Sequence, residues 1–356
     1  MQKEITSFFN EISGFYDSNL PFVVFRKPND NLITSYVQNS EELYYLNSFE
    51  EQGFVFAPFN KSEKSIIFPA DKCNMLTSEI LNEEVLEIGS SNFNFKVTSN
   101  ENSKENHIKL VQKGIDFIKN GNAKKVVVSR KETLECDKFD VINTLKKMLN
   151  SYKNAFVYLW YHPTIGLWMG ASPERLINVS NNKFNTMSLA GTQLYKKLTD
   201  VVWEEKEQQE QQFVTDFILE NIKESICNIK LTKPYTVKAG NLAHIRTDIS
   251  GDLKTANLLE SLIVALHPTP AVCGLPKGKS IDFILENENY NRAYYSGYLG
   301  EFNLDNRTNL FVNLRCMQLS DNLASIYIGG GITMNSIAEN EWKETVSKAE
   351  VMKRVL

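Results

Sequence analysis

The sequence feature that most restricts the fold lies near the C-terminus, in residues 326–350. The stretch begins with an apolar run at residues 326–328, which predicts a buried strand. Three glycines follow at residues 329–331 and allow the backbone to approach another group closely, because they have no Cβ atoms. Ser336 and Glu339 match a capping box, which predicts that a helix begins there. The stretch therefore predicts a strand, a glycine loop and a helix in that order.

Two acids and a lysine share one side of this predicted helix. Glu341 and Glu344 are three residues apart, and Lys348 follows Glu344 by four. These spacings bring side chains together on a helix. Carboxylates suit a divalent cation, and a lysine near free backbone N–H groups suits an anion. The arrangement predicts a site that holds a small anion together with a divalent cation.

A second predicted helix, in residues 202–226, carries acids on the side of its apolar stripe. The stripe consists of Phe213, Val214, Phe217, Ile218 and Ile222. Projected back along the helix, it includes Glu210 and then Glu207. Acids that face a core are costly unless they are paired or bind a cation. The alternative is a solvated acidic segment that the helix dipole stabilises, and this helix alone leaves both interpretations open.

Two titratable residues lie at the ends of predicted strands. Lys125 precedes the β-branched residues 126–128, which predict a buried strand. A lysine at a strand end is commonly solvated, but burial favours the uncharged amine, which can act as a base. Glu174 follows a proline near the start of another apolar strand, where a carboxylate is either a surface group or an acid in a cleft.

Other positions suggest contacts with an anion. Gly191 and Thr192 offer backbone N–H groups and a hydroxyl for a carboxylate, although the same residues also fit an ordinary turn. Arg315 lies among apolar neighbours, and a buried arginine requires an anion from the protein or from a ligand. His244 lies inside a predicted strand and is interpreted as a hydrogen-bonded core residue.

Composition and charge restrict the class of protein. The chain has 356 residues, 42% of them hydrophobic and 23% charged, as in soluble globular proteins. Its net charge of −4 implies no nucleic-acid partner. The five cysteines form no CxxC motif, which argues against a zinc site or a disulfide framework. Apolar runs are too short to span a membrane and no signal peptide is recognisable, so we expect a cytoplasmic protein.

Several ordered motifs resemble the chorismate-utilising enzymes. These motifs are KVVVSR, GASPERL, LAGT, HPTPAVCG, R-x-YYSGYLG, LRC and GGGI…S…EW-x-ET-x-x-K. The family includes isochorismate synthase, salicylate synthase, and component I of anthranilate and aminodeoxychorismate synthases. The resemblance implies an α+β fold, in which two large, mainly antiparallel β-sheets pack together with helices outside. It also implies one domain over residues 1–356, with a scaffold part at 1–105 and a catalytic part at 106–356.

Within the family, a few positions favour isochorismate synthase. Lys125 matches the base of isochorismate and salicylate synthases, which anthranilate synthases lack. Ala190 stands where aminodeoxychorismate synthases carry a nucleophilic lysine. Ser188 departs from the usual proline, and Tyr295 occurs in salicylate synthases where some isochorismate synthases have phenylalanine. Salicylate synthase therefore remains the alternative, and a non-catalytic chorismate-binding relative is a further one.

The resemblance implies a role for each candidate site residue. Lys125 is the base that activates water, and Glu174 is the acid that protonates the leaving hydroxyl. Glu210 and Glu344 bind Mg²⁺ directly, and Glu207 and Glu341 support them. The residues that contact chorismate are Gly191, Thr192, Ala271, Arg315, Gly329 and Lys348. We expect no glutamine amidotransferase subunit, a monomer or weak homodimer, and a product used for menaquinone or for a siderophore.

Overall fold

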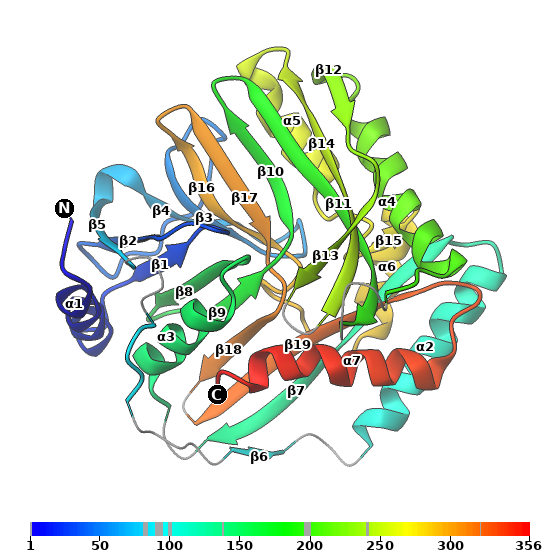
Figure 1. The fold of residues 1–356 in the computed structure, drawn as a ribbon, viewed down its shortest axis with the longest axis horizontal. Helices are drawn as coiled ribbons and strands as arrows, with labels where there is room; N and C mark the ends of the chain where they lie inside the picture. The colour runs from blue at the N-terminus through cyan, green and yellow to red at the C-terminus, as the bar shows by residue number, and fades with distance from the viewer. Residues whose placement is uncertain are drawn as a thin grey trace.

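The computed structural model describes residues 2–80, 85–89, 95–98, 102–136, 139–195, 201–239, 242–320 and 322–356. Two large sheets, named sheet A and sheet B, occupy the middle of the molecule, with helices around them (Figure 1). This architecture confirms the α+β fold that the sequence predicts.

Sheet A has ten strands among the described residues. They are β1 (Phe22–Arg26), β2 (Leu32–Gln38), β5 (Cys73–Glu79), β6 (Phe95–Val97), β7 (Lys125–Cys136), β8 (Phe156–His162), β9 (Gly166–Ser172), β15 (Gly274–Leu275), β18 (Cys316–Ser320) and β19 (Leu323–Ile332). Their order is β15-β7-β19-β18-β9-β8-β1-β2-β5, with β6 also paired to β7. The antiparallel pair β7 and β19 runs from Glu135 opposite Leu323 to Val126 opposite Ile332.

Sheet B has nine strands in the described part of the chain. They are β3 (Gly53–Ala57), β4 (Ile66–Pro69), β10 (Arg175–Ser180), β11 (Lys183–Leu194), β12 (Ile226–Leu231), β13 (Tyr235–Ala239), β14 (Leu242–Leu253), β16 (Tyr298–Leu304) and β17 (Arg307–Val312). Their order is β12-β14-β11-β10-β17-β16-β3-β4, with β13 also paired to β14. The register of β11 on β14 shifts between Ala190 and Gln193, so Gly191 and Thr192 depart from the regular ladder.

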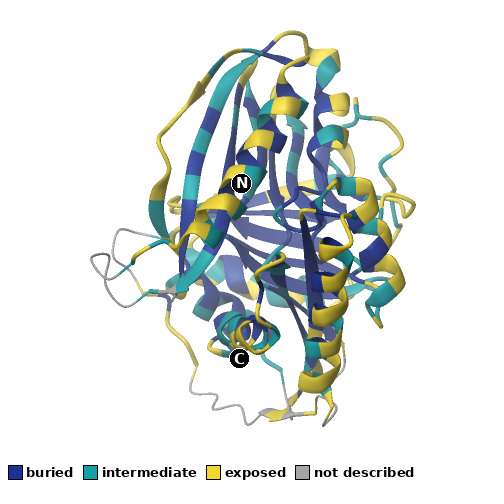
Figure 2. Cartoon of the chain, turned by 90° about the vertical axis from the view of Figure 1, so that its right-hand side faces the viewer, coloured by how far each residue is buried: buried dark blue, intermediate teal, exposed yellow. Residues whose placement is uncertain are grey.

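An aromatic core joins the inner faces of the two sheets. Phe156 of sheet A stacks on Phe311 of sheet B with ring centroids 4.2 Å apart, and Trp160 of sheet A meets Phe56 of sheet B in a tilted arrangement at 4.7 Å. The buried residues form a continuous interior along the strands, and exposed residues lie on the outer sides of the helices (Figure 2). Large rings bury much apolar area, so these contacts hold the sheets together.

Seven α-helices of the described chain cover the sheets. They are α1 (Ile5–Asp17), α2 (Ser103–Lys119), α3 (Val141–Ser151), α4 (Glu205–Ile222), α5 (Leu259–Leu266), α6 (Lys277–Asn287) and α7 (Ala338–Lys353). Apolar residues of α1, α3 and the end of α7 pack against sheet A, and those of α4 and α5 pack against sheet B. No helix in the described ranges combines the length and the apolar character needed to cross a membrane.

The first third of the chain contributes strands to both sheets. In sheet A, β1 pairs with β8 from Phe22 opposite Tyr161 onwards. In sheet B, β3 pairs with β16, with Ala57 opposite Tyr298. The strands of the first third are therefore hydrogen-bonded to the later part of the chain, while the interpretation of residues 1–105 as scaffold stays a prediction.

The C-terminal stretch differs in two details from the sequence prediction. Residues 329–331 belong to the strand β19 and not to a loop, because they continue the ladder opposite residues 127–129 of β7. The capping box is wrong as well. The helix α7 begins at Ala338, and the Ser336 hydroxyl accepts a hydrogen bond from the Thr333 N–H instead.

Candidate active site

A cavity near the ends of β7, β11 and β19 brings together most of the predicted site residues. Its walls include the predicted residues Glu174, Gly191, Thr192, Glu210, Ala271, Arg315, Gly329 and Lys348. They come from both sheets, from α4 and α7, and from the segments that precede β10, β15 and β18. Residues that are up to 174 positions apart in the sequence thus converge on one site.

Lys125, the first residue of β7, is fully buried next to this cavity. Its Nζ lies 2.7 Å from Glu210 Oε1 of α4, and it is Glu210 that lines the cavity. Such an ion pair favours the carboxylate form of the glutamate. Burial raises the pKa of Glu210, but Lys125 together with Lys348 and Lys206 outweighs burial, so the pKa of the carboxyl lies below its usual value.

Two glycines of β19, Gly329 and Gly331, make this close packing possible. A Cβ atom on Gly331 would overlap Glu210 Oε1 and would lie 2.9 Å from Lys125 Cε. A Cβ atom on Gly329 would lie 2.6 Å from the Tyr295 hydroxyl oxygen. The close backbone approach predicted from the glycines is therefore confirmed, although it occurs along a strand.

Glu174 is the most strongly perturbed acid of the cavity wall. It is only 3% exposed, and burial raises its pKa to about 7, although Thr269 and the charge of Lys125 act in the opposite direction. Thr269 Oγ1 lies 3.3 Å from Glu174 Oε1 and can donate a hydrogen bond to it. A carboxyl group with this pKa still carries a proton in a large fraction of molecules at neutral pH.

Arg315 lies against His244, a residue for which the sequence suggested only a core role. Arg315 Nη2 is 2.6 Å from His244 Nε2, and His244 Nδ1 is 2.8 Å from the Gly191 carbonyl oxygen. Burial and the Arg315 charge lower the pKa of His244 to about 3, so the imidazole is neutral. It accepts from Arg315 and donates to Gly191, and it thereby connects two predicted substrate contacts. A lone histidine in a strand carries no sequence signal for this role.

The four predicted metal-side acids gather around lysines. Besides the Lys125–Glu210 pair, Lys206 Nζ lies 2.7 Å from Glu341 Oε1, and Lys348 Nζ lies 2.7 Å from Glu344 Oε1. Within the described ranges, no three His, Cys, Asp or Glu side chains are grouped closely enough to form a metal site by themselves. Three of these four acids are therefore paired with lysines, and the binding of a metal ion by this group stays a prediction.

Glu207 is the acid of this group without such a lysine partner. Its Oε2 atom is buried and has no hydrogen-bond partner among the described residues. Burial raises the pKa of this carboxyl above its usual value. The Glu207 side chain also lies against Gly191, where a Cβ atom would be 3.0 Å from the Glu207 Cβ and the backbone φ of +72° favours glycine.

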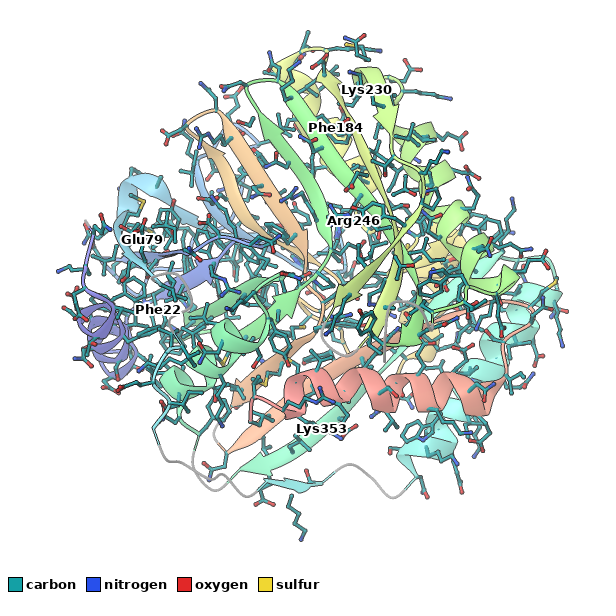
Figure 3. All side chains as sticks on the ribbon, in the orientation of Figure 1. Phe22, Glu79, Phe184, Lys230, Arg246 and Lys353 are labelled. Carbon is teal, nitrogen blue, oxygen red and sulfur yellow. The ribbon has the colours of Figure 1, made fainter. Side chains whose placement is uncertain are left out.

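Contacts with β7 hold α7, which carries Glu341, Glu344 and Lys348, in place. Arg130 Nε donates to Thr345 Oγ1 at 2.8 Å, and its guanidinium lies 4.5 Å from the centroid of the Trp342 ring. Near the end of the helix, Lys353 pairs with Glu132 at 2.5 Å (Figure 3). These contacts fix the position of α7 and its rotation about its own axis relative to the cavity.

Two buried polar networks behind the cavity were missed by the sequence analysis. Arg292 pairs with Glu288 at 2.5 Å and donates to the carbonyl oxygens of Val127 and Val272, which line the cavity. The second network joins α4 to sheet B: Gln211 Nε2 lies 2.6–3.0 Å from the hydroxyls of Ser188, Thr215 and Thr247. Ser188, the departure from the family's proline, is thus a partner of the residue that follows Glu210. Spacing in one sequence does not reveal such long-range partners.

Comparisons with known proteins find relatives among the anthranilate and isochorismate synthases. The chain is 26% identical over 289 residues to anthranilate synthase component 1 of Thermococcus kodakarensis, covering 77% of this chain and 64% of that protein. It is 28% identical over 201 residues to the isochorismate synthase EntC of Escherichia coli, covering 53% and 51%. The chain thus spans between about half and two thirds of the length of these relatives.

The fold is also found in solved structures. DhbC of Bacillus anthracis superposes with a TM-score of 0.81 at 21% identity, covering 98% of this chain and 99% of that one. The chorismate binding enzyme family matches residues 60–356, which include every candidate site residue. Because this match extends over most of the sequence, the chain belongs to the chorismate binding enzymes.

Proposed function

We propose that this protein is an isochorismate synthase, which converts chorismate to isochorismate. Water forms a new C–O bond at ring C2, the ring double bonds shift, and the hydroxyl at C4 leaves. Lys125 takes a proton from the attacking water, and Glu174 gives a proton to the departing oxygen. One water molecule enters and one leaves, so the reaction is an isomerisation.

The observation that carries this proposal is the burial of Glu174 in the wall of a cavity that adjoins the buried Lys125. A pKa of about 7 supplies a general acid at neutral pH, and its closeness to the working pH favours efficient proton transfer. Lys125 matches the water-activating base of isochorismate and salicylate synthases, and it lies near enough for its charge to act on Glu174. The curated relatives include isochorismate and anthranilate synthases at similar identity, so Lys125 and not overall identity supports the choice between them.

The substrate carboxylates have candidate partners on the cavity wall. Lys348 Nζ lies 3.0 Å from the Gly329 carbonyl oxygen, which places an ammonium at the wall next to β19. Arg315 is held by His244 on the opposite sheet. We assign Arg315 and Lys348 to the enolpyruvyl carboxylate. The remaining contacts with chorismate are assigned to Gly191, Thr192, Ala271 and Gly329.

The acids at this site fit Mg²⁺. Four carboxylates face three lysines, the buried Glu207 Oε2 has no hydrogen-bond partner in the described chain, and Mg²⁺ prefers such oxygen ligands. We assign Glu210 and Glu344 as direct ligands, with Glu207 and Glu341 supporting them. When bound, the ion would hold the ring carboxylate of chorismate and neutralise Glu210. Lys125 acts as a base only in its uncharged form. A second cation near Glu210 would balance this carboxylate in place of the Lys125 ammonium, and the base requires such a cation for that reason.

Product analysis tests the proposal. The protein is incubated with chorismate and Mg²⁺, and the products are separated by chromatography and identified by NMR. We expect isochorismate without pyruvate, and loss of this product in Lys125→Ala and after EDTA. Anthranilate formed in the presence of ammonium, or no turnover of chorismate at all, would refute the assignment.

Salicylate synthase is the second candidate because of Tyr295. This tyrosine lines the cavity, and its ring stacks on Tyr327 with centroids 5.6 Å apart. Salicylate together with one equivalent of pyruvate in the same assay would favour this activity. We keep the expectation that the protein acts without an amidotransferase subunit, as a monomer or weak homodimer. We also keep the expectations of a cytoplasmic location and of a product used for menaquinone.

A further inference from the structure

A second cavity lies next to the site, on the other side of Lys206. It has a volume of about 300 Å³ and is bounded by the end of α2, by one face of α4 and by residues 333–335, which lead from β19 to α7. Lys206 lines this cavity, and its Nζ also pairs with Glu341 Oε1 at 2.7 Å. One side chain therefore connects the second cavity to the acids of the active site.

The wall of this cavity carries more positive than negative charge. Lys124 and Lys206 contribute two ammonium groups, whereas Glu205 is the one carboxylate among the described residues of the wall. Glu205 already accepts a hydrogen bond from Gln209 Nε2 at 2.8 Å. Lys124 Nζ lies 5.9 Å from the centroid of the Phe213 ring. The charge balance favours a ligand with a single negative charge.

The remaining wall suits an apolar body. Phe213 supplies an aromatic face, and Met334 stands 56% exposed at the cavity, although methionine usually lies inside a protein. Methionine side chains adapt readily to different apolar partners. The Thr333 side chain also belongs to this wall, and its buried hydroxyl has no hydrogen-bond partner among the described residues. An aromatic ring that carries one carboxylate matches all of these groups.

We propose that this second cavity binds a small aromatic monocarboxylate, whose carboxylate meets Lys124 and Lys206. A carboxylate at Lys206 competes with Glu341 for the same ammonium, and it thereby changes the charge balance among the acids of the active site. The binding itself is independent of the reaction. Its effect on turnover rests on the proposed function, in which Glu341 supports the metal ligands.

Binding is tested with benzoate, titrated into the full chain and followed by calorimetry. We expect benzoate to bind the wild-type protein, to bind about fivefold more weakly to Lys124→Ala, and to lose this binding in Met334→Trp, whose indole fills the cavity. Lys109→Ala, on the exposed side of α2, serves as the control and should bind like the wild type. Absence of binding, or equal affinity in all four proteins, would overturn the proposal.

The effect on turnover is measured separately. Benzoate should reduce the conversion of chorismate in the wild-type protein by an inhibition that excess chorismate does not relieve, and Met334→Trp should be insensitive. Inhibition that chorismate fully relieves would place benzoate in the active site and refute the coupling. If the chain forms no isochorismate, the proposed function fails while the calorimetric result still decides whether the second cavity is a binding site.

Discussion

Lys125 Nζ lies 2.7 Å from Glu210 Oε1, and this ion pair joins the first residue of β7 to the face of α4 that lines the cavity. The lysine side chain is fully buried and the glutamate is 14% exposed. Each group offsets part of the cost of burying the other's charge, so the loss of one partner leaves a buried charge unpaired. The pair therefore contributes to the stability of the protein as well as to the proposed chemistry, and the two effects can be separated by mutation.

Replacement of Glu210 by glutamine should destabilise the protein. Glu210→Gln leaves a buried ammonium without its carboxylate, and the loss of one partner of a buried pair costs about 3 kcal/mol. Urea unfolding without substrate measures the free energy of unfolding. Glu220→Gln, at an exposed position of the same helix, is the control and should change it by less than about 0.5 kcal/mol. Equal stability of both variants would contradict an energetic role for the ion pair.

The raised pKa of Glu174 predicts a pH dependence of stability. In the folded protein the pKa is about 7, against a usual value of 4.5, so the folded state binds the proton more tightly. The stabilisation is complete below pH 4.5 and is lost as the pH rises towards 7, a difference of about 3 kcal/mol. As the pH rises from 4.5 to 7, the free energy of unfolding of Glu174→Gln should fall less than that of the wild type. Parallel curves for the two proteins would show that Glu174 has an ordinary pKa.

Removal of the His244 side chain should weaken substrate binding more than turnover. His244→Ala deletes the acceptor of Arg315 and the donor to Gly191, so both substrate contacts lose their orientation. We expect KM for chorismate to rise about tenfold, with a smaller change in kcat. His162→Gln, which alters a histidine of β8 outside the cavity wall, should leave KM unchanged. A fall in kcat at constant KM would instead indicate a role of His244 in the chemical step.

A methyl group on Gly331 should disrupt the site. In Gly331→Ala the new Cβ overlaps Glu210 Oε1 and crowds Lys125, so we expect a loss of about 1–3 kcal/mol of stability and of most of the activity. Gly278→Ala is the matched control, because a Cβ there meets no atom within 4 Å and the residue lies in α6. This variant should be as stable as the wild type or slightly more stable. Retained activity in Gly331→Ala would mean that the Lys125–Glu210 contact is not needed.

Much of the fold and of the site can be read from local sequence patterns. The acid-bearing helices α4 and α7 follow from the spacing of apolar residues and acids, and the strand before the glycines follows from its apolar run. Ordered motifs identify the family, and most of the site residues that it implies then fall on positions that line one cavity. The capping residue at Ser336 and the end of β19 could not be predicted in this way. A ladder with β7 holds the glycines in the strand, and the Ser336 hydroxyl bonds to Thr333 instead.

The sequence by itself determined the candidate site residues, because hydrophobic period, glycine content and motifs depend only on neighbours along the chain. Only the tertiary structure decided their charge and their partners. Lys125 meets Glu210 across 85 positions, Lys206 meets Glu341 across 135, and His244 meets Arg315 across 71. Such pairs form because strand register and helix packing bring distant segments together. A buried charge without a partner would be costly, so the charged side chains are paired.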